Sequence, residues 1–410
     1  MTSNAFDVLT ERGFIEQVSD AEGVRAAMEG PITCYIGFDP SASSFHVGNL
    51  VPIMALAHMQ RHGHRPIAVM GGGTGMVGDP SGKTEMRQLL AVAQIDAHVT
   101  TLKGQMANLI DFSEGRAFMV NNADWLRRLN YLEFLRDIGR HFSVNRMLAA
   151  EAYRTRYESE QGLSFLEFNY MLLQAYDFLH LYREYDCVLQ MGGNDQWGNI
   201  LAGVDLIRRT DGAQAYAATF PLVTTNSGAK MGKTAEGAVW LDPELVSPYE
   251  YYQYWINVDD ADVERFLALF TFVPMERVRE LGRLQGADIR RAKEVLALEA
   301  TRILHGEDAA REAQEAARQL FGKGVVTDAV PTTDIKAAEL EAGIPAPELF
   351  ESVGLCRSRS EARRLIQQGG AYINEEAVPN VDQTISMEDL VDGEVLLRAG
   401  KKRYHRLRVS

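Results

Sequence analysis

The 410-residue chain has few cysteines, and their spacing gives them no shared role. Cys34, Cys187 and Cys356 lie far apart, form no C-x-x-C pair and make an odd number. This pattern argues against a disulfide framework and against a zinc knuckle, and no metal-ligand motif stands out elsewhere. We therefore expect three reduced structural thiols and no metal held by the protein itself.

Long apolar runs and a leader-like start are also missing. No apolar run approaches the roughly 20 residues of a membrane span. The start, MTSNAFDVLTERGFIEQ, lacks a basic segment followed by an apolar core. We expect a cytoplasmic protein, and 46% hydrophobic with 24% charged residues is ordinary for a soluble globular chain. The length predicts two or three compact units.

An overall positive charge is absent as well. The formal net charge is −14, which argues against nonspecific binding of nucleic acid. The C-terminal end is different, because residues 398–410 contain six basic residues and no acidic one. This tail is either a solvated terminus or a strip that contacts phosphates.

The order of strand-like and helix-like segments predicts the architecture. Segments 32–38, 65–72, 117–125 and 187–193 resemble buried strands, and helical patterns at 46–63, 95–112 and 195–210 alternate with them. A helical insertion around 131–185 interrupts this rhythm. The pattern is typical of an α/β fold with a parallel, Rossmann-like sheet, which we assign to a domain at residues 1–246.

The rest of the chain divides into three further parts. Strand signals vanish over residues 247–320, which we predict to be a helical domain. Residues 321–345 mix Gly, Pro, Thr and acidic residues, and we interpret them as a linker. Residues 346–410 form a small α+β domain, in which a basic helix at 360–368 is stopped by Gly369 and Gly370.

The glycine-rich stretch GGGTGMVGDPSGKT, residues 71–84, fits two phosphate-loop templates imperfectly. Gly73, Gly75 and Gly78 satisfy G-x-G-x-x-G after a predicted strand, but the turn pair that follows, Asp79-Pro80, delays any helix. A Walker A loop would need glycine at position 77, where this chain has Val77. The stretch alone leaves its ligand undecided.

Two short motifs carry groups suited to phosphate chemistry. HVGN, residues 46–49, precedes a predicted helix, so His46 and the first N–H groups lie at its positive end, and Gly48 leaves room for an adenine ring. KMGKT, residues 230–234, places two lysines three residues apart, where they could stabilise a departing pyrophosphate. Taken singly, the first could be a helix cap and the second a solvated loop.

Together the motifs resemble the class I aminoacyl-tRNA synthetases. YIGFDPSASSFHVGN is similar to the segment with the HIGH signature, and KMGKT is similar to the KMSKS loop. The resemblance to the bacterial tyrosyl-tRNA synthetases is more specific, because SFLEFNYMLLQAYDF and LQMGGNDQWGNI follow in that family's order over almost the whole chain. Asn49 departs from the second His of HIGH, and Gly232 and Thr234 depart from the serines of KMSKS, for which we expect quantitative effects only.

The resemblance implies the roles of individual residues. Stretch 71–84 becomes an amino-acid site beside a phosphate site. The tyrosine pocket would contain Tyr35, Asp79, Asn122, Tyr170, Gln174, Asp177, Gln190 and Gln196. ATP would contact Gly37, Asp39, Ser41, His46, Gly48, Asn49, Gly193, Asp195, Lys230, Met231 and Lys233. The catalytic set would be His46, Asn49, Lys83, Arg87, Lys230, Lys233 and Thr234.

Spacing agrees with part of this assignment. Tyr170, Gln174 and Asp177 are separated by four and three residues, so they share one face of a helix expected from Ser164. That polar face could also be the solvent side of the helix. By resemblance, Tyr170 and Gln174 join Asp79 around the tyrosine ammonium, whereas Asp177 and Tyr35 bind the phenol.

The implied reaction activates tyrosine with ATP and then transfers it to the terminal ribose of tRNA(Tyr). Mg²⁺ would accompany the phosphates without dedicated protein ligands. The helical domain would recognise the anticodon, and an S4-like domain would bind tRNA through Arg357, Arg359, Arg363, Arg364, Lys401, Lys402 and Arg403. The resemblance also implies a homodimer formed through the catalytic domain. The alternatives are a small-molecule nucleotidyltransferase and a non-catalytic RNA-binding scaffold. Within the class I synthetases, the tryptophanyl-tRNA synthetases are the nearest relatives of the tyrosyl enzymes, but Tyr35 with Asp177 suits a phenol better than an indole.

Overall fold

The computed structural model covers nearly the whole chain. It describes residues 3–409 except 82–90, 160–161, 227, 229–230, 232, 235–236, 324–329, 392 and 401–402. Side chains at 233–234, 237 and 320–323 are also outside the description. Among the helices described, none is long and apolar enough to cross a membrane.

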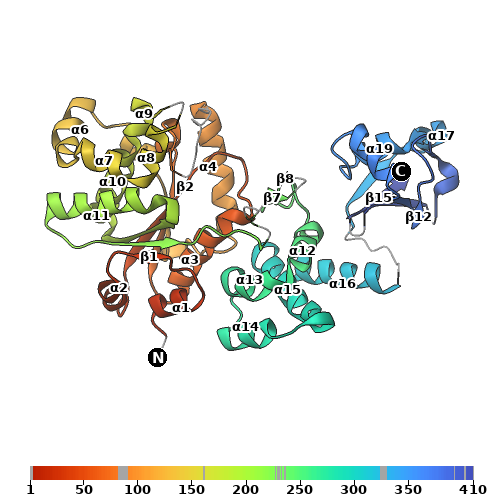
Figure 1. Cartoon of the computed structure of the whole chain (residues 1–410), viewed down its shortest axis with the longest axis horizontal. Helices are drawn as coiled ribbons and strands as arrows, with labels where there is room; N and C mark the ends of the chain where they lie inside the picture. The colour runs from red at the N-terminus through yellow and green to blue at the C-terminus, as the bar shows by residue number, and fades with distance from the viewer. Residues whose placement is uncertain are drawn as a thin grey trace.

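A six-stranded sheet forms the centre of the first part of the chain (Figure 1). Its order is β1 (Gln17–Val18), β6 (Tyr216–Phe220), β5 (Cys187–Gly193), β2 (Thr33–Phe38), β3 (Arg65–Met70) and β4 (Phe118–Asn121). Every pairing is parallel except that of β1 with β6. The predicted α/β class with a parallel sheet is therefore confirmed. From β2, the chain adds β3 and β4 on one side of the sheet and then β5 and β6 on the other side, so the strand order reverses at β2.

Side chains from the two faces of this sheet enter two different cores. On one face, Ile36, Ala68 and Leu189 pack with α3 (Leu50–Arg61) and α4 (Val92–Met106). On the other face, Tyr35 and Ile67 pack with α10 (Tyr170–Tyr185) and α11 (Trp197–Asp211). Alternate residues of a strand point to opposite faces, so the central strands must be apolar almost throughout.

Short helices fill the insertion between β4 and β5. They are α5 (Ala123–Leu126), α6 (Tyr131–Asp137), α7 (Val144–Ala149), α8 (Glu151–Tyr157) and α9 (Phe165–Phe168). The single helix expected from Ser164 is in fact two, because α9 ends at Phe168, Asn169 caps it, and α10 begins at Tyr170. The Tyr153 hydroxyl lies at this junction, where it accepts from the Met171 N–H at 2.8 Å and lies 3.1 Å from the Phe168 carbonyl oxygen.

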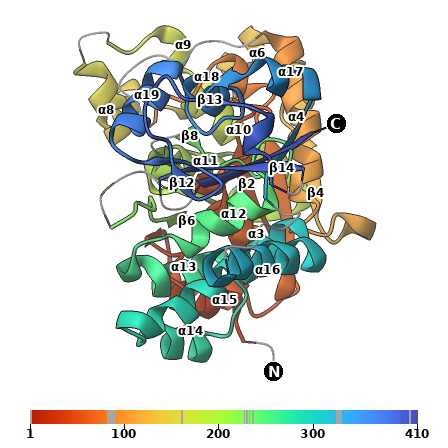
Figure 2. The same cartoon turned by 90° about the vertical axis from the view of Figure 1, so that its right-hand side faces the viewer.

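The predicted helical region consists of five helices packed together (Figures 1 and 2). They are α12 (Pro248–Ile256), α13 (Val263–Phe270), α14 (Met275–Gly282), α15 (Ile289–His305) and α16 (Glu307–Lys323). Their buried residues belong to the same core as α3 and one face of the sheet. In addition, Arg12, after α1 (Ala5–Glu11), donates to the carbonyls of Ala268, Thr271 and Val273 at 2.6–2.9 Å. The helices are therefore joined to the catalytic part through a continuous core.

The C-terminal unit has its own core and a five-stranded sheet ordered β12-β11-β14-β15-β9. Its elements are β9 (Thr332–Ile335), α17 (Ala337–Ala342), β10 (Ile344–Pro345), α18 (Ala346–Ser352), α19 (Arg359–Gln367), β11 (Ala371–Ile373), β12 (Glu376–Ala377), β13 (Thr384–Ile385), β14 (Glu394–Ala399) and β15 (Arg403–Val409). Strand β9 pairs in parallel with β15, so residues 332–345, which we expected to be linker, belong to this unit. An edge strand with three of its four residues exposed lacks the apolar alternation that would have marked it in the sequence.

Candidate active site

The predicted site residues gather at the carboxyl ends of four neighbouring strands. Asp39 and His46 follow β2, Asp79 follows β3, Asn122 follows β4, and Asp195 follows β5. In open parallel sheets ligands bind at this edge, where strand order reverses on either side of the middle strand. The topology therefore brings together side chains that are more than 150 residues apart in the sequence.

Asp177 is the buried centre of one end of the site. One carboxylate oxygen accepts a hydrogen bond from Asn122 Nδ2 at 2.8 Å, and the other accepts from Trp125 Nε1 at 2.7 Å. Burial outweighs these two bonds and raises the pKa of Asp177 to about 7. A third donor, such as the hydroxyl of a ligand, would favour the ionised carboxylate.

Three buried oxygens near Asp177 have no hydrogen-bond partner within the described residues. They are Tyr35 Oη, Gln174 Oε1 and Gln190 Oε1. Tyr35 and Gln190 are paired across β2 and β5, and Gln174 lies one turn before Asp177 on α10. Buried polar groups are rarely left unpaired in native proteins, so this cluster indicates a place where a polar ligand binds.

Asp79 forms a second anionic point. Its carboxylate accepts from the Ser81 N–H at 2.9 Å and from Gln196 Nε2 at 2.6 Å. Burial, and then the nearby Asp39, raise the pKa of Asp79 to about 6. A ligand ammonium group would reverse this shift. Tyr170 is buried at the start of α10, which packs against the 3₁₀ turn η2 (Thr74–Met76) of the same glycine-rich loop.

The glycine-rich loop packs against the end of β4. Asn122 Oδ1 accepts from the Gly73 N–H at 2.7 Å, and Asn122 Nδ2 donates to Thr74 Oγ1 at 2.9 Å as well as to Asp177. A Cβ atom on Gly72 would collide with the Asn121 side chain. Within residues 71–81, these glycines therefore serve close packing that positions Asp79 and Asn122.

His46 is held in one orientation by its own turn. It is the N-cap of the 3₁₀ turn η1 (Val47–Asn49), which leads into α3. His46 Nδ1 accepts from the Gly48 N–H at 3.0 Å, and Asn49 Oδ1 accepts from the His46 N–H at 3.0 Å. Because Nδ1 is an acceptor, the proton of the neutral ring lies on Nε2, which can donate to a phosphate. Asn49 thus uses its oxygen to fix the turn.

The segment that carries KMGKT pairs with the HVGN turn. Its hairpin strands are β7 (Lys233–Thr234) and β8 (Gly237–Ala238). Beyond the hairpin, the Val47 N–H donates to the Val239 carbonyl at 2.9 Å, and the Trp240 ring meets His46 edge-on at 6.2 Å. Met231 is buried, and its carbonyl oxygen would lie 3.0 Å from a Cβ on Gly48. The two motifs therefore form one unit.

At several of the remaining residues predicted to contact ATP, the backbone is exposed or carries no side chain. Gly37 is the one exposed residue of β2, Asp39 is half-buried, and Ser41 is exposed. A Cβ on Gly193 would lie 2.6 Å from Asp195 Oδ1, so glycine allows the Asp195 carboxylate to fold over the chain. Lys83, Arg87 and Lys230 lie outside the described residues, as do the side chains of Lys233 and Thr234.

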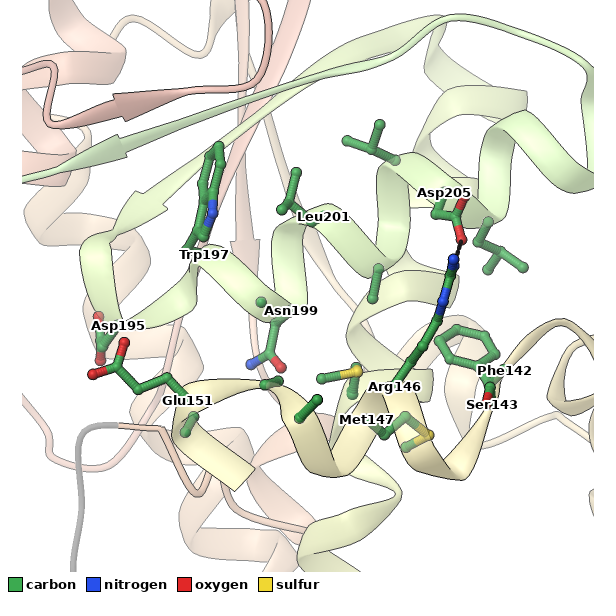
Figure 3. A pocket seen from close by; sticks show the side chains of 18 of the residues that line it. Phe142, Ser143, Arg146, Met147, Glu151, Asp195, Trp197, Asn199, Leu201 and Asp205 are labelled. Atoms are coloured by element: carbon green, nitrogen blue, oxygen red, sulfur yellow. Dashed lines mark ion pairs between the residues drawn. The ribbon is translucent and has the colours of Figure 1, made fainter. Parts of the chain in front are cut away.

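Asp195 also borders a cavity of about 910 Å³ between α7, α8 and α11. Figure 3 shows Asp195 and Trp197 at one end of the cavity and the Arg146–Asp205 ion pair at the other, with 3.7 Å between nitrogen and oxygen. This cavity adjoins Asp195, whereas Tyr35, Asp177 and Gln190 do not line it.

Sequence reasoning missed two tryptophans and a polar pair in the site. Trp125 holds Asp177, Trp240 contacts His46, and Asn199 Nδ2 lies 3.3 Å from both Ser81 Oγ and Gln196 Oε1. Trp125 follows Asn122 by three residues at the end of a predicted strand, and this position could have identified it as a site residue. The role of Trp240 depends on pairing between distant segments and had none.

The basic residues of the C-terminal unit fall into two groups. Arg357, Arg363 and Arg364 are exposed, as is Arg359, which pairs with Glu348 and Glu351 at 3.1–3.2 Å. The tail forms strand β15, in which Arg403 donates to the Leu355 carbonyl at 2.8 Å and the buried Arg406 pairs with Glu394 at 3.2 Å. Lys401 and Lys402 lie outside the described residues. Arg406 is therefore neither part of a solvated terminus nor exposed for phosphate contacts, the two possibilities considered for residues 398–410.

Comparison with known proteins gives the family. Residues 27–322 match the model for class I tRNA synthetases of the W and Y group, and residues 324–407 match the model for the SYY-like C-terminal domain of tyrosine–tRNA ligases. The chain is 59% identical to the tyrosine–tRNA ligase of Desulfosudis oleivorans, over 97% of both chains, and 57% identical to that of Desulfatibacillum aliphaticivorans, over the full length of both. The chain belongs to the tyrosine–tRNA ligases. Like other members of this family, it is an aminoacyl-tRNA synthetase, with ATP as a substrate.

Solved structures agree with this family. A C-terminally truncated mitochondrial tyrosyl-tRNA synthetase of Aspergillus nidulans superposes with a TM-score of 0.70 at 30% identity, covering 78% of this chain and 94% of that one. The tyrosyl-tRNA synthetase of Archaeoglobus fulgidus, complexed with L-tyrosine, shares the fold at a TM-score of 0.57 and 17% identity, covering 76% of this chain and 99% of that one.

Proposed function

We propose that the chain activates L-tyrosine with ATP and transfers it to tRNA(Tyr), and that Asp177 selects the substrate. The observation that carries this assignment is the buried Asp177 carboxylate, fixed by Asn122 and Trp125 beside the unpartnered Tyr35 hydroxyl. A phenol can donate to the carboxylate and accept from Tyr35. An indole N–H can only donate, so this pair of groups suits tyrosine better than tryptophan.

In the first step, the tyrosine carboxylate attacks the α-phosphorus of ATP, and pyrophosphate leaves. Asp79 binds the tyrosine ammonium, with Tyr170, Gln174 and Gln196 around it, and Asp195 binds the ribose. No side chain acts as a covalent nucleophile. The rate enhancement comes from positioning the reactants and from donors aimed at charge that grows on the phosphates.

The phosphate donors are His46 Nε2–H together with Lys83, Arg87, Lys230 and Lys233, whose roles rest on the resemblance. Mg²⁺ enters with the phosphates and shares their charge. Within the described residues, no group of three His, Cys, Asp or Glu side chains is placed to hold a metal ion.

In the second step, the tyrosyl group passes to the 3′-terminal ribose of tRNA(Tyr). We assign anticodon recognition to helices α12–α16. Phosphate contacts fall to the exposed Arg357, Arg363 and Arg364 around α19, with Arg359, Lys401, Lys402 and Arg403 as further members of the set. An acidic protein needs such a local basic surface to bind a polyanion.

We further propose a cytoplasmic homodimer formed through the catalytic part. Exposed large apolar residues are concentrated in the insertion: Tyr131, Leu132, Leu135, Val144, Tyr157, Phe165 and Leu166. Leu132 is 74% exposed and Phe165 is 70% exposed. Apolar side chains gathered in this way favour an interface between protein chains.

The deciding experiment is ATP–pyrophosphate exchange with each of the twenty amino acids, followed by tRNA charging. Exchange that depends on tyrosine, together with charging of tRNA(Tyr), is the expected result. Exchange with a non-amino-acid substrate alone would favour a small-molecule nucleotidyltransferase. RNA binding without any exchange would favour a non-catalytic scaffold.

A further inference from the structure

The segment that carries KMGKT is attached at both ends, and each end is attached to a different part of the molecule. After the hairpin, it pairs with the HVGN turn, through Val47 N–H to Val239 O at 2.9 Å and Leu241 N–H to Phe45 O at 2.8 Å. Before the motif, it contacts helices of the 248–323 region. The described residues on either side of the motif therefore connect the active-site turn with those helices.

Asp262 makes the principal contact before the motif. It ends the 3₁₀ turn η6 (Asp260–Asp262), directly before α13, and is only 6% exposed. Its Oδ2 accepts from the Asn226 backbone N–H at 2.8 Å. Hydrogen bonds from N–H groups to carboxylates are about twice as strong as neutral ones, and this one acts on backbone four residues before Lys230.

Two further side chains from the same helices contact the segment. Arg265, one turn into α13, donates to the Thr224 carbonyl and lies 3.9 Å from Asp262 Oδ1. Tyr254 on α12 places its hydroxyl 3.3 Å from Met231 Sδ, inside the motif. Both helices are held by the continuous core through Trp255, Phe266 and Phe270, so these contacts come from a rigid support.

We infer that Asp262 and Arg265 are positioning residues for adenylate formation: by holding residues 224–226 on α13, they place the lysines of KMGKT against the departing pyrophosphate. The inference rests on the proposed phosphate role of those lysines. Charge stabilisation in a transition state depends on donor placement to within a fraction of an ångström, whereas tyrosine binding at Asp177 and Asp79 does not involve this segment. Loss of either contact therefore slows the chemical step without weakening tyrosine binding.

The test is single-turnover adenylate formation by the full-length protein, with tyrosine affinity measured separately by fluorescence titration. Asp262→Ala and Arg265→Ala each lower the rate constant by about 10-fold, as expected for misplacement of a catalytic group by less than 1 Å, and leave the tyrosine Kd within about twofold. Asp262→Asn keeps an oxygen acceptor for the Asn226 N–H and recovers most of the rate. Asp260→Ala is the matched control, because Asp260 lies in the same turn but is 62% exposed and pairs with Lys293.

The double variant Asp262→Ala/Lys233→Ala separates the inference from its premise. If both residues act through the segment, the double variant is no slower than the slower single variant by more than about twofold. If Lys233→Ala lowers the rate constant of adenylate formation but Asp262→Ala and Arg265→Ala do not, the inference is overturned and its premise stands. A normal Lys233→Ala overturns the role of the motif itself. Should Asp262→Ala fail to fold, Arg265→Ala decides, since Arg265 is half-exposed and its truncation empties no buried position.

Discussion

At the scale of single residues, Asn122 connects two functions of the site. Its oxygen fixes the glycine-rich loop at Gly73, and its amide nitrogen donates to both Thr74 and Asp177. One side chain therefore positions the loop that carries Asp79 and the carboxylate proposed to bind the phenol. Because the Asp177 carboxylate needs partners to remain ionised when buried, Trp125 is as much a part of this arrangement as Asn122.

Asp177→Ala should reduce selectivity for tyrosine. The hydroxyl of tyrosine loses its partner, whereas phenylalanine loses nothing, and tyrosyl-tRNA synthetases are the standard example of selectivity obtained in this way. We expect the tyrosine/phenylalanine ratio of kcat/KM to fall by about 10- to 100-fold, the usual value of a hydrogen bond to a charged group. Pyrophosphate exchange with each amino acid measures the ratio. An unchanged ratio would remove Asp177 from the specificity site.

Asp177→Asn should alter the pH dependence of stability in the ligand-free protein. The folded pKa of Asp177 is about 7, raised by burial from its ordinary 3.8. The stability linked to its proton is therefore fully present below pH 3.8 and is lost as pH rises through about 7. Asparagine has no such loss. The thermal unfolding midpoint of the variant, minus that of the parent, should therefore increase by a few degrees between pH 5 and pH 8. A difference that stays constant across this range would contradict the shifted pKa.

At the scale of elements, two short segments outside the main sheet do most of the positioning. The glycine-rich loop is shaped by its contact with the end of β4, and the KMGKT segment is shaped by its pairing with HVGN. Neither would hold this shape alone, since each depends on backbone partners elsewhere in the chain. Substitutions in them should therefore affect placement more than overall stability.

Lys233→Ala should slow adenylate formation while leaving tyrosine affinity nearly normal. A positive charge near pyrophosphate matters most as the leaving group gains charge, so its removal raises the transition state more than the ground state. We expect about a 100-fold lower single-turnover rate constant, the scale seen when one preorganised charge donor is lost. Lys336→Ala, in the C-terminal unit, is the control for the loss of a lysine. An unaltered rate would return KMGKT to the status of a solvated loop.

At the scale of the whole molecule, the three parts differ in how strongly they are joined. Helices α12–α16 share a core with the catalytic sheet. The C-terminal unit has a separate core, and its Tyr404 also packs against the larger one. The helices should therefore fold with the catalytic part, and the C-terminal unit should be removable. Crystallised mitochondrial relatives described as C-terminally truncated have this fold over 76–78% of the chain.

A chain that ends at Lys323 should keep tyrosine-dependent pyrophosphate exchange and lose most tRNA charging. The cut lies before β9, because β9 belongs to the C-terminal sheet. In the full-length chain, Arg363→Ala/Arg364→Ala should weaken tRNA binding most at low salt and make it less dependent on salt, since fewer phosphate contacts release fewer counterions. Normal charging by the truncated chain at moderate salt would refute the tRNA-binding role. Loss of exchange as well would show that the unit is needed for folding.

Leu132→Glu and Phe165→Glu should each shift the protein from dimer to monomer. A charge buried at an apolar interface without a partner costs several kcal/mol, roughly the difference between nanomolar and micromolar association. Light scattering after size exclusion measures the mass. Leu245→Glu, which alters an exposed leucine outside the insertion, is the control. A parent protein that is already monomeric at micromolar concentration would exclude the proposed dimer.

The sequence by itself determined the fold class, and its resemblance to a known family supplied the candidate site residues. Apolar runs with helices between them specify a parallel sheet. The resemblance implied roles for Asp39, Asp79, Asn122 and Asp195, and the fold places all four at the edge of the sheet formed by the carboxyl ends of the strands. The spacing of Tyr170, Gln174 and Asp177 indicates one helical face. It does not show that the expected helix is divided at the point where the Tyr153 hydroxyl accepts from the Met171 N–H.

Only the tertiary structure decided the contacts between distant segments. Three such contacts are the ring contact of Trp240 with His46, the hydrogen bond from the Asn226 N–H to Asp262, and the pairing of β9 with β15. In each, the local sequence gives no sign of the partner. Local propensity reflects neighbours within a few residues, whereas these contacts depend on how the sheet and helices pack once formed. For the same reason, the sequence left residues 398–410 as either a solvated terminus or a strip that contacts phosphates, whereas the fold places Arg406 in a buried ion pair with Glu394.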